Sequence, residues 1–322
     1  MSEYDLVIVG AGPAGLTGAL YAGRSMLRTV LLEKGVPGGE LLNTEVIEDY
    51  PGFESVKGYE LAEKMAAHAL KFGAELVTDG VESVEKEPDG RFVVTTESGE
   101  RYRAPVVLLT AGGTPTKLGV PGETEYAGKG VSYCAVCDGH FFRGEVLGVV
   151  GGGDAAAEEA DFLTRYASKV VLIHRRDELR ASKIIQRRLF ENPKIEVVWD
   201  TVVERIEGSA GALAQLALRN VKTGATSALP VGGVFIFVGF RPNTGIVRGH
   251  ARHDAGGHLD TDEVMMTSIP GLYAAGDVRA QLTRQVTTAV GDATTAVIAA
   301  TRYLAEWKER QEARAAQSRH AD

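Results

Sequence analysis

The chain has 322 residues, more than a single domain usually holds, and this length predicts two domains. Hydrophobic residues make up 44% and charged residues 24%, the composition of a globular protein with enough apolar material for two cores. The formal net charge of −8 argues against nucleic acid as a partner, and no apolar run is long enough to span a membrane. No signal-like stretch precedes the first expected strand, so we expect the cytoplasm.

The first structural pattern is an expected strand over residues 4–9, a glycine-rich turn over 10–15, a helix over 16–25 and a strand over 28–32. Glu33 ends this unit, about 20 residues beyond the glycines, where an acid accepts hydrogen bonds from a ribose diol. A glycine-rich turn alone is weak evidence for nucleotide binding. In this context it indicates a dinucleotide site rather than an ordinary turn.

The turn reads Gly-Ala-Gly-Pro-Ala-Gly, and its three glycines have different tasks. Gly10 permits the tight turn, Gly12 lets the backbone approach a pyrophosphate, and Gly15 lets the helix pack closely on the strand. Free N–H groups at the helix N-terminus favour the phosphates.

A loop over residues 37–41 and another over 49–53 follow, then an expected helix over 58–73 whose apolar stripe belongs to the core. Short strands are predicted over 74–110, the last of them the buried run 106–109. The breaker cluster over 112–115 then predicts an interdomain linker.

Both cysteines of the chain, Cys134 and Cys137, lie in one Cys-x-x-Cys motif. This spacing lets the pair switch between dithiol and disulfide, and the thiolate is the species that attacks another disulfide. Asp138 follows directly, as a general acid beside the pair or as a simple helix cap.

Two other interpretations of the cysteines are weaker. A zinc site would have Cys134, Cys137 and His140 as ligands, without a second cluster to complete it, so we predict no metal. A structural disulfide does not suit a chain without secretory features.

The first pattern then repeats, with an expected strand over 146–150, glycines from 151 to 153, a helix over 157–166 and a strand over 169–173. The second strand ends in His174-Arg175-Arg176, with Arg180 close behind, where the first copy has Glu33. Arginines hold a 2′-phosphate through charge-assisted bonds, so this copy favours NADPH over NADH. The alternative is a solvated charged turn.

Strands and turns are expected as far as residue 240, including a buried strand over 234–238. A breaker over 239–243 predicts the second linker. A buried strand ending in Gly276-Asp277 follows, then Arg284-Gln285 and a helix over 286–308. The charged tail over 309–322 is expected to be frayed or disordered.

Two nucleotide sites and one dithiol together predict an electron path. NADPH at the second site delivers a hydride, and a disulfide accepts two electrons. A flavin can couple the two, so we expect FAD at the first site.

These motifs, in this combination and order, resemble bacterial-type, low-molecular-weight thioredoxin reductase over essentially the whole chain. The resemblance implies an α/β fold of two Rossmann-like, three-layer nucleotide-binding domains, the second inserted into the first. It places FAD in residues 1–113 and 243–322, and NADPH with the cysteine pair in residues 114–242. It further implies a homodimer and a domain that rotates about the two linkers between the half-reactions.

The resemblance also implies the roles of individual residues. Cys137 would face the flavin, Cys134 would attack the disulfide of thioredoxin, and Asp138 would protonate a leaving thiolate. FAD would contact Gly10, Gly12, Pro13, Ala14, Gly15, Glu33, Lys34, Gly39, Glu40, Leu41, Asp49, Val81, Gly112, Gly276, Asp277, Arg284, Gln285 and Val286. NADPH would contact Gly151, Gly153, Asp154, Ala155, Ala156, His174, Arg175, Arg176 and Arg180.

The chain departs from the family pattern at Thr110-Ala111-Gly112, at Gly291-Asp292-Ala293 and at two expected FAD contacts. Glu40 stands where the family usually has glutamine, and Asp49 where it usually has asparagine. A negative charge near the flavin disfavours its reduced, anionic form, so we expect a modest shift in flavin potential with FAD retained. An unshifted potential in an Asp49→Asn variant would contradict this expectation.

The sequence therefore predicts an NADPH-dependent, FAD-containing thioredoxin reductase whose partner is thioredoxin or a thioredoxin-like protein. The nearest alternative is the same machinery with another redoxin or peroxiredoxin partner, or a small-molecule dithiol oxidase, which would not need the NADPH site. A non-enzymatic flavoprotein or redox-sensing module is a different class, and it would not need all three features together.

Overall fold

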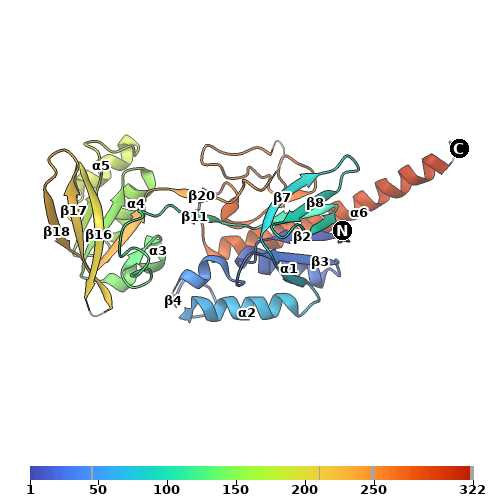
Figure 1. Cartoon of the computed structure of the whole chain (residues 1–322), viewed down its shortest axis with the longest axis horizontal. Helices are drawn as coiled ribbons and strands as arrows, with labels where there is room; N and C mark the ends of the chain where they lie inside the picture. The colour runs from blue at the N-terminus through green and yellow to red at the C-terminus, as the bar shows by residue number, and fades with distance from the viewer. Residues whose placement is uncertain (45, 210, 248–250, 320–322) are drawn as a thin grey trace. The chain divides into compact units, whose positions relative to one another are not determined.

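The computed structural model describes residues 1–44, 46–209, 211–247 and 251–319. The chain forms two compact units, Met1–Thr114 with Arg241–Asp322, and Pro115–Phe240 between them in the sequence (Figure 1). Among the described residues, no helix combines the length and the apolar character that a membrane span requires.

The first unit is organised around a five-stranded sheet in the order β21-β10-β2-β3-β6. All neighbouring strands run parallel, so their carboxyl ends meet at one edge. In this spatial order the strands are β21 (Leu272–Ala274), β10 (Val106–Leu109), β2 (Leu6–Val9), β3 (Thr29–Glu33) and β6 (Glu75–Thr78).

Helices cover one face of this sheet and a second sheet covers the other, which makes three layers (Figure 1). The helices are α1 (Pro13–Arg24), α2 (Gly58–Leu70) and α6 (Val286–Arg319). The second sheet has the order β1-β9-β8-β7, with β1 (Ser2–Glu3), β9 (Arg101–Ala104), β8 (Phe92–Thr96) and β7 (Val81–Lys86).

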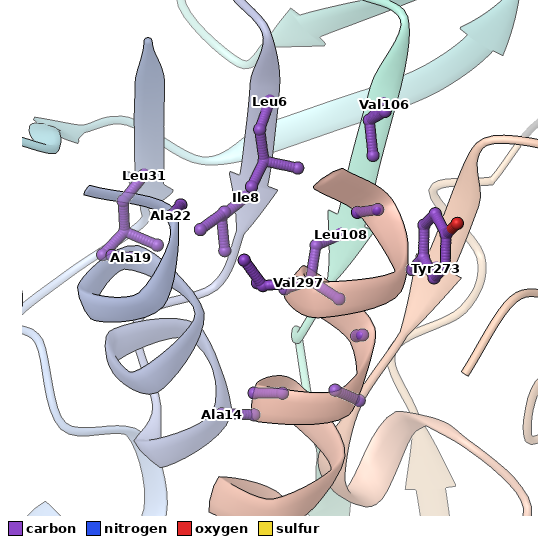
Figure 2. Close-up of a cluster of buried hydrophobic side chains, with 14 of the residues drawn as sticks. Leu6, Ile8, Ala14, Ala19, Ala22, Leu31, Val106, Leu108, Tyr273 and Val297 are labelled. Atoms are coloured by element: carbon purple, nitrogen blue, oxygen red, sulfur yellow. The ribbon is translucent and has the colours of Figure 1, made fainter. Parts of the chain in front are cut away.

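Successive side chains of the central strands point to opposite faces of the sheet, and this alternation produces the two cores. Leu6 and Ile8 of β2 point to the helices, where alanines of α1 and Val297 of α6 meet them (Figure 2). Val7 and Val9 pack into the opposite core, against the second sheet. Small helical residues allow close packing: a Cβ added at Gly18 would lie 2.8 Å from Leu108 Cδ2.

The second unit repeats this three-layer plan. Its parallel sheet has the order β12-β19-β13-β14-β15. Helical residues pack on one face and an antiparallel sheet in the order β16-β17-β18 on the other. The strands of the parallel sheet are β12 (Val131–Ser132), β19 (Gly233–Phe237), β13 (Val146–Gly151), β14 (Lys169–Ile173) and β15 (Ile195–Val198). The remaining elements are α3 (Ala135–Asp138), α4 (Asp154–Leu163), α5 (Lys183–Glu191), β16 (Thr201–Ser209), β17 (Ala212–Asn220) and β18 (Thr226–Pro230).

The expected fold class, α/β with two Rossmann-like units, is confirmed by this architecture. The two connections between the units, expected as linkers, pair as a two-stranded ribbon of β11 (Gly113–Pro115) and β20 (Phe240–Pro242). Short elements complete the fold: η1 (Gly39–Asn43), β4 (Val46–Ile47), β5 (Val56–Lys57), η2 (Gly139–Phe142) and η3 (Gly276–Val278).

Three expectations about helices were wrong. Helices α1 and α4 begin three residues earlier than expected, directly at the glycine turns, and Pro13 fits the first turn of α1 because its N–H has no partner to lose there. Helix α5 was missed: five of its nine residues are charged or amide side chains, and two of its four apolar residues, Ile184 and Phe190, stay exposed.

The tail beyond residue 308 was also expected to be frayed or disordered, yet α6 continues to Arg319. Alanine, glutamate, glutamine and arginine dominate this stretch, and all are strong helix formers. Glu306 and Arg310 form an ion pair one helical turn apart, with 3.4 Å between Oε2 and Nη1. An existing helix extends at little cost because its nucleus is already formed. Residues 320–322 lie outside the described residues.

Candidate active site

Cys134 and Cys137 are joined by a disulfide at the start of α3, with their Cα atoms 5.3 Å apart. Cys134 is the N-cap residue of this short helix, and the backbone N–H of Cys137 donates to Cys134 Sγ at 3.2 Å. After reduction, an N–H aimed at this sulfur favours its anionic form. Val136, between the cysteines, is 46% exposed, so a partner can reach the pair in this unit.

Asp138 is bonded to a residue that the sequence did not point out. Its Oδ2 accepts a hydrogen bond from Ser132 Oγ at 2.6 Å, and Ser132 Oγ in turn accepts the backbone N–H of Cys134 at 3.1 Å. Asp138 makes no capping hydrogen bond to η2. Its carboxyl is therefore held beside the cysteine pair through Ser132, as an acid–base role requires.

The first glycine turn has the geometry that a nucleotide diphosphate needs. Gly10 has a φ of +99°, and a Cβ at Gly15 would lie 1.8 Å from Gly10 O. At Gly12 an added Cβ would meet only Gly39 Cα, at 3.9 Å, so the backbone there is open. No side chain caps the N-terminus of α1. These observations fit the pyrophosphate of a dinucleotide on the first turn of α1.

Glu33 lies at the end of β3, against this turn. Its Oε2 accepts the N–H of Ala11 at 2.6 Å, and its Oε1 accepts the N–H of Gly35 at 3.0 Å. Each carboxylate oxygen keeps a further acceptor position, so Glu33 remains able to bind ribose hydroxyls.

Segments far apart in the sequence meet the glycine turn. The N–H of Gly38 donates to Ala11 O at 2.8 Å, which brings the loop before η1 against the turn. A Cβ at Gly276 would lie 3.2 Å from Ala14 Cβ, so the turn after β21 also packs here. Thr110 Oγ1 donates to Gly10 O at 2.7 Å and connects the end of β10.

Asp277 carries unusual electrostatics in this site. Burial raises the pKa of Asp277 to about 6, the neighbouring Arg284 guanidinium opposes the rise, and the negative charges of Glu40 and Asp292 add to it. Glu40, which departs from the family pattern at an expected FAD contact, therefore acts on a residue of the candidate FAD site. Asp49, which departs at the other such contact, is solvent-exposed.

A Glu40→Gln variant should raise the free energy of unfolding of the apoprotein by about 0.5–1 kcal/mol near pH 7.5. The variant lacks one charge that raises the pKa of Asp277. Because the folded-state pKa, about 6, exceeds the ordinary 3.8, ionised Asp277 destabilises the fold, increasingly as pH rises from about 4 to above 6. Urea unfolding should therefore show little difference near pH 4.5. Glu54→Gln, at an exposed acid of the same unit, is the control, and equal differences at both pH values would contradict the prediction.

The other expected FAD residues are distributed around this region. Leu41 is buried in a cluster that Val286 borders. Val81 begins β7, and Gly112, with a φ of +57°, precedes the ribbon. Gln285 lies directly before α6, where its N–H donates to Thr288 Oγ1 at 3.1 Å. Lys34 is exposed and pairs with Glu97 at 2.7 Å.

The second glycine turn has the same design. A Cβ at Gly151 would lie 2.5 Å from Phe237 O, whereas at Gly153 an added Cβ would meet nothing within 4 Å. Asp154 begins α4, and its Oδ1 accepts the N–H of Ser182 at 2.6 Å. Ala155 follows in the first turn, and Ala156 is buried. The open backbone at Gly153 again fits a diphosphate.

His174 is buried beneath this turn. A Cβ at Gly152 would lie 2.1 Å from His174 Cε1, and His174 Nδ1 lies 2.8 Å from Gly151 O, so Nδ1 carries the proton. His174 therefore supports the turn from below. Arg175, Arg176 and Arg180 are exposed, and the N–H of Arg180 donates to Gly152 O at 2.7 Å.

Sequence reasoning assigned no role to several residues that support the site. Ser132 carries no motif of its own, and only its place two residues before Cys134 could have pointed to it. Asp292 Oδ2 accepts the N–H of Gly276 at 3.1 Å and pairs with Arg279 at 3.3 Å. Buried Glu123 accepts the Tyr133 hydroxyl at 2.8 Å. No group of three or more potential metal-ligating side chains is found within the described part of the chain.

Two nucleotide-binding units and one disulfide in the same chain define the class of disulfide oxidoreductases that bind two nucleotides. The model of the pyridine nucleotide-disulphide oxidoreductase family matches residues 4–293. Thioredoxin reductase of Listeria innocua is 46% identical over 314 residues, which are 97% of this chain and 98% of the relative. That of Bacillus subtilis is 44% identical over 313 residues, 96% of this chain and 98% of the relative.

A solved structure agrees with these relatives. Thioredoxin reductase from Streptococcus pyogenes superimposes with a TM-score of 0.91 at 48% identity, covering 95% of this chain and 99% of that one. The chain belongs to the pyridine nucleotide-disulphide oxidoreductase family and, within it, to the thioredoxin reductases. The resemblance expected from the sequence is confirmed.

Proposed function

We propose that this chain is an NADPH-dependent, FAD-containing thioredoxin reductase. The observation that carries the proposal is the Cys134–Cys137 disulfide in the second nucleotide-binding unit. The chain around it matches a thioredoxin reductase over 98% of the length of that relative. FAD, when bound, supplies the coupling between a two-electron hydride donor and a disulfide.

Each redox residue has a distinct part in the reduction of thioredoxin. The Cys134 thiolate attacks one sulfur of the thioredoxin disulfide, and a mixed disulfide forms as the other thioredoxin sulfur leaves. Asp138 supplies the proton that this leaving sulfur takes up. Cys137 then attacks the Cys134 sulfur, which re-forms the disulfide and releases thioredoxin as a dithiol. The hydrogen bond from Cys137 N–H to Cys134 Sγ supports Cys134 as the attacking sulfur.

The two nucleotides occupy different units in this proposal. FAD binds residues 1–113 and 243–322, along the first glycine turn, Glu33 and the Gly276–Asp277 turn. NADPH binds residues 114–242, with its diphosphate on the second glycine turn and its 2′-phosphate on Arg175, Arg176 and Arg180. The exposure of these three arginines supports this role.

The domain motion, assembly and location belong to the proposal as well. Rotation between the half-reactions would take place at residues 112–115 and 239–243, the two connections that pair as β11 and β20. We place the protein in the cytoplasm as a homodimer. Analytical ultracentrifugation of the holoprotein tests the dimer, and a single monomer boundary would exclude it.

An anaerobic titration tests the function directly. The purified holoprotein should bleach at low NADPH, respond weakly to NADH, and regain its flavin colour on addition of oxidised thioredoxin. Bleaching of the flavin without reoxidation by thioredoxin would indicate that the partner is another redoxin or a peroxiredoxin. A flavin that bleaches with neither nucleotide would exclude the second unit as an NADPH site.

Asp138→Asn should slow thioredoxin reduction by about 100-fold near pH 7.5, because the amide cannot protonate the leaving sulfur. Bleaching of the flavin by NADPH should remain at the wild-type level, and stopped-flow absorbance separates the two steps. Ser132→Ala, which removes the hydrogen-bond donor to Asp138 and the acceptor for the Cys134 N–H but keeps the carboxyl, should have a smaller effect. Wild-type turnover in D138N would exclude Asp138 as the acid.

A further inference from the structure

A buried histidine lies behind Arg284, outside every motif of the sequence. His258 is only 6% exposed and lies in the segment that precedes β21. Its Nε2 is 2.9 Å from Nη2 of Arg284, and its Nδ1 is 3.1 Å and 3.2 Å from the two carboxylate oxygens of Asp254. Carboxylate, imidazole and guanidinium thus form one chain of hydrogen bonds.

The chemistry of these groups determines where the protons lie. A guanidinium can only donate, so Nε2 of His258 must accept. Nδ1 then carries the imidazole proton and donates it to Asp254. Partial burial of Asp254 opposes its ionisation, but hydrogen bonds from the backbone N–H and ring of His258 and the N–H of Gly256 outweigh it and lower the pKa of Asp254. Asp254 therefore remains a carboxylate that maintains this tautomer.

Arg284 in turn faces the candidate FAD site. Its positive charge acts on the half-buried Asp277, on which the negative charges of Glu40 and Asp292 also act. An arginine side chain has many rotamers, and ordering it costs conformational entropy. A fixed acceptor behind the guanidinium lowers that cost at the moment when a ligand binds.

We propose that Asp254 and His258 are positioning residues that hold the Arg284 guanidinium for FAD binding. The inference rests on the proposed function, in which Arg284 contacts FAD. Loss of the imidazole acceptor should therefore weaken FAD binding, and a neutral acceptor in its place should preserve it.

Three variants separate this role from a merely structural one. His258→Phe removes the acceptor at every pH. His258→Gln keeps an acceptor for Arg284 and a donor for Asp254. His253→Gln changes an exposed histidine of the same segment and is the matched control. Reconstitution of the apoproteins with FAD, followed by quenching of flavin fluorescence, measures the dissociation constant of FAD for each variant.

The H258F variant should bind FAD about tenfold more weakly near pH 7.5, the value of one charge-assisted hydrogen bond. H258Q should bind like wild type there, and H253Q should do the same. In an Arg284→Met background, H258F should cause no further loss, because His258 acts through Arg284. Thermal unfolding of each apoprotein records any general loss of stability.

Several results would overturn the proposal. These are wild-type affinity in H258F, a loss in H258Q as large as that in H258F, or full additivity of H258F with R284M. A wild-type protein that binds no FAD at any pH would instead refute the proposed function itself. Turnover of thioredoxin by a FAD-saturated H258F variant keeps the two failures apart.

Discussion

Serine in place of Cys134 or Cys137 is expected to abolish thioredoxin reduction, with a loss of at least about 1,000-fold, because a hydroxyl cannot form the disulfide. Reduction of the flavin by NADPH should continue in both variants, since the nucleotide-binding turns are unchanged. Anaerobic bleaching measures the first half-reaction, and coupled turnover with thioredoxin measures the whole cycle.

The two serine variants also distinguish the roles of the cysteines. In Cys137→Ser the attacking thiol remains but the resolving thiol is lost, so a stable mixed disulfide between Cys134 and thioredoxin should accumulate. Cys134→Ser should give none. Non-reducing electrophoresis followed by mass spectrometry detects the adduct. An adduct that forms only in C134S would mean that Cys137 attacks and Cys134 resolves. Residual turnover above about 1% in either variant would exclude the pair as the obligatory route of electrons to thioredoxin.

Loss of both Arg175 and Arg176 is expected to lower kcat/KM for NADPH by about 100- to 1,000-fold, the value of two charge-assisted contacts to a 2′-phosphate. The value for NADH, which lacks this phosphate, should change less than about threefold. An R175Q/R176Q variant assayed with both nucleotides under identical conditions and ionic strength gives the ratio directly.

The control for this variant is Arg205→Gln, at another exposed arginine of the same unit, whose nearest paired acid is Glu207 at 3.8 Å. It should leave both kcat/KM values unchanged. A uniform loss with NADPH and NADH in R175Q/R176Q would indicate damage to the unit as a whole. An unchanged preference for NADPH would show that the arginines form a solvated turn and that selectivity arises elsewhere.

Structural features that depend on residues close together in the sequence could be predicted well. Strand β14 has its expected bounds, and β10 follows the buried run 106–109. Both glycine turns have the geometry expected of them, because the positive φ of Gly10 and the close approach of Gly15 to Gly10 O arise within a few residues. The Cys-x-x-Cys spacing likewise brings the two sulfurs together whatever the rest of the chain does.

Errors arose where neighbours outside the local pattern decide the structure. Helix α5 is short and mostly polar and keeps two large apolar residues exposed, so packing of its few buried side chains on the rest of its unit stabilises it. The extension of α6 beyond residue 308 depends on a helix that the core has already nucleated. Neither the packing of α5 nor the nucleation of α6 can be inferred from the residues of the segment alone.

By itself, the sequence determined the fold class, the two nucleotide turns, the redox pair and the family, because each depends on residue types at short, fixed spacing. Only the tertiary structure placed Glu40, Asp277, Arg284 and Asp292 within electrostatic range of one another, and set His258 behind Arg284. These residues come from separate loops that meet only when the parallel sheet of the first unit has formed. Burial then raises the pKa of Asp277, and burial is a property of the assembled layers that no short stretch of sequence carries.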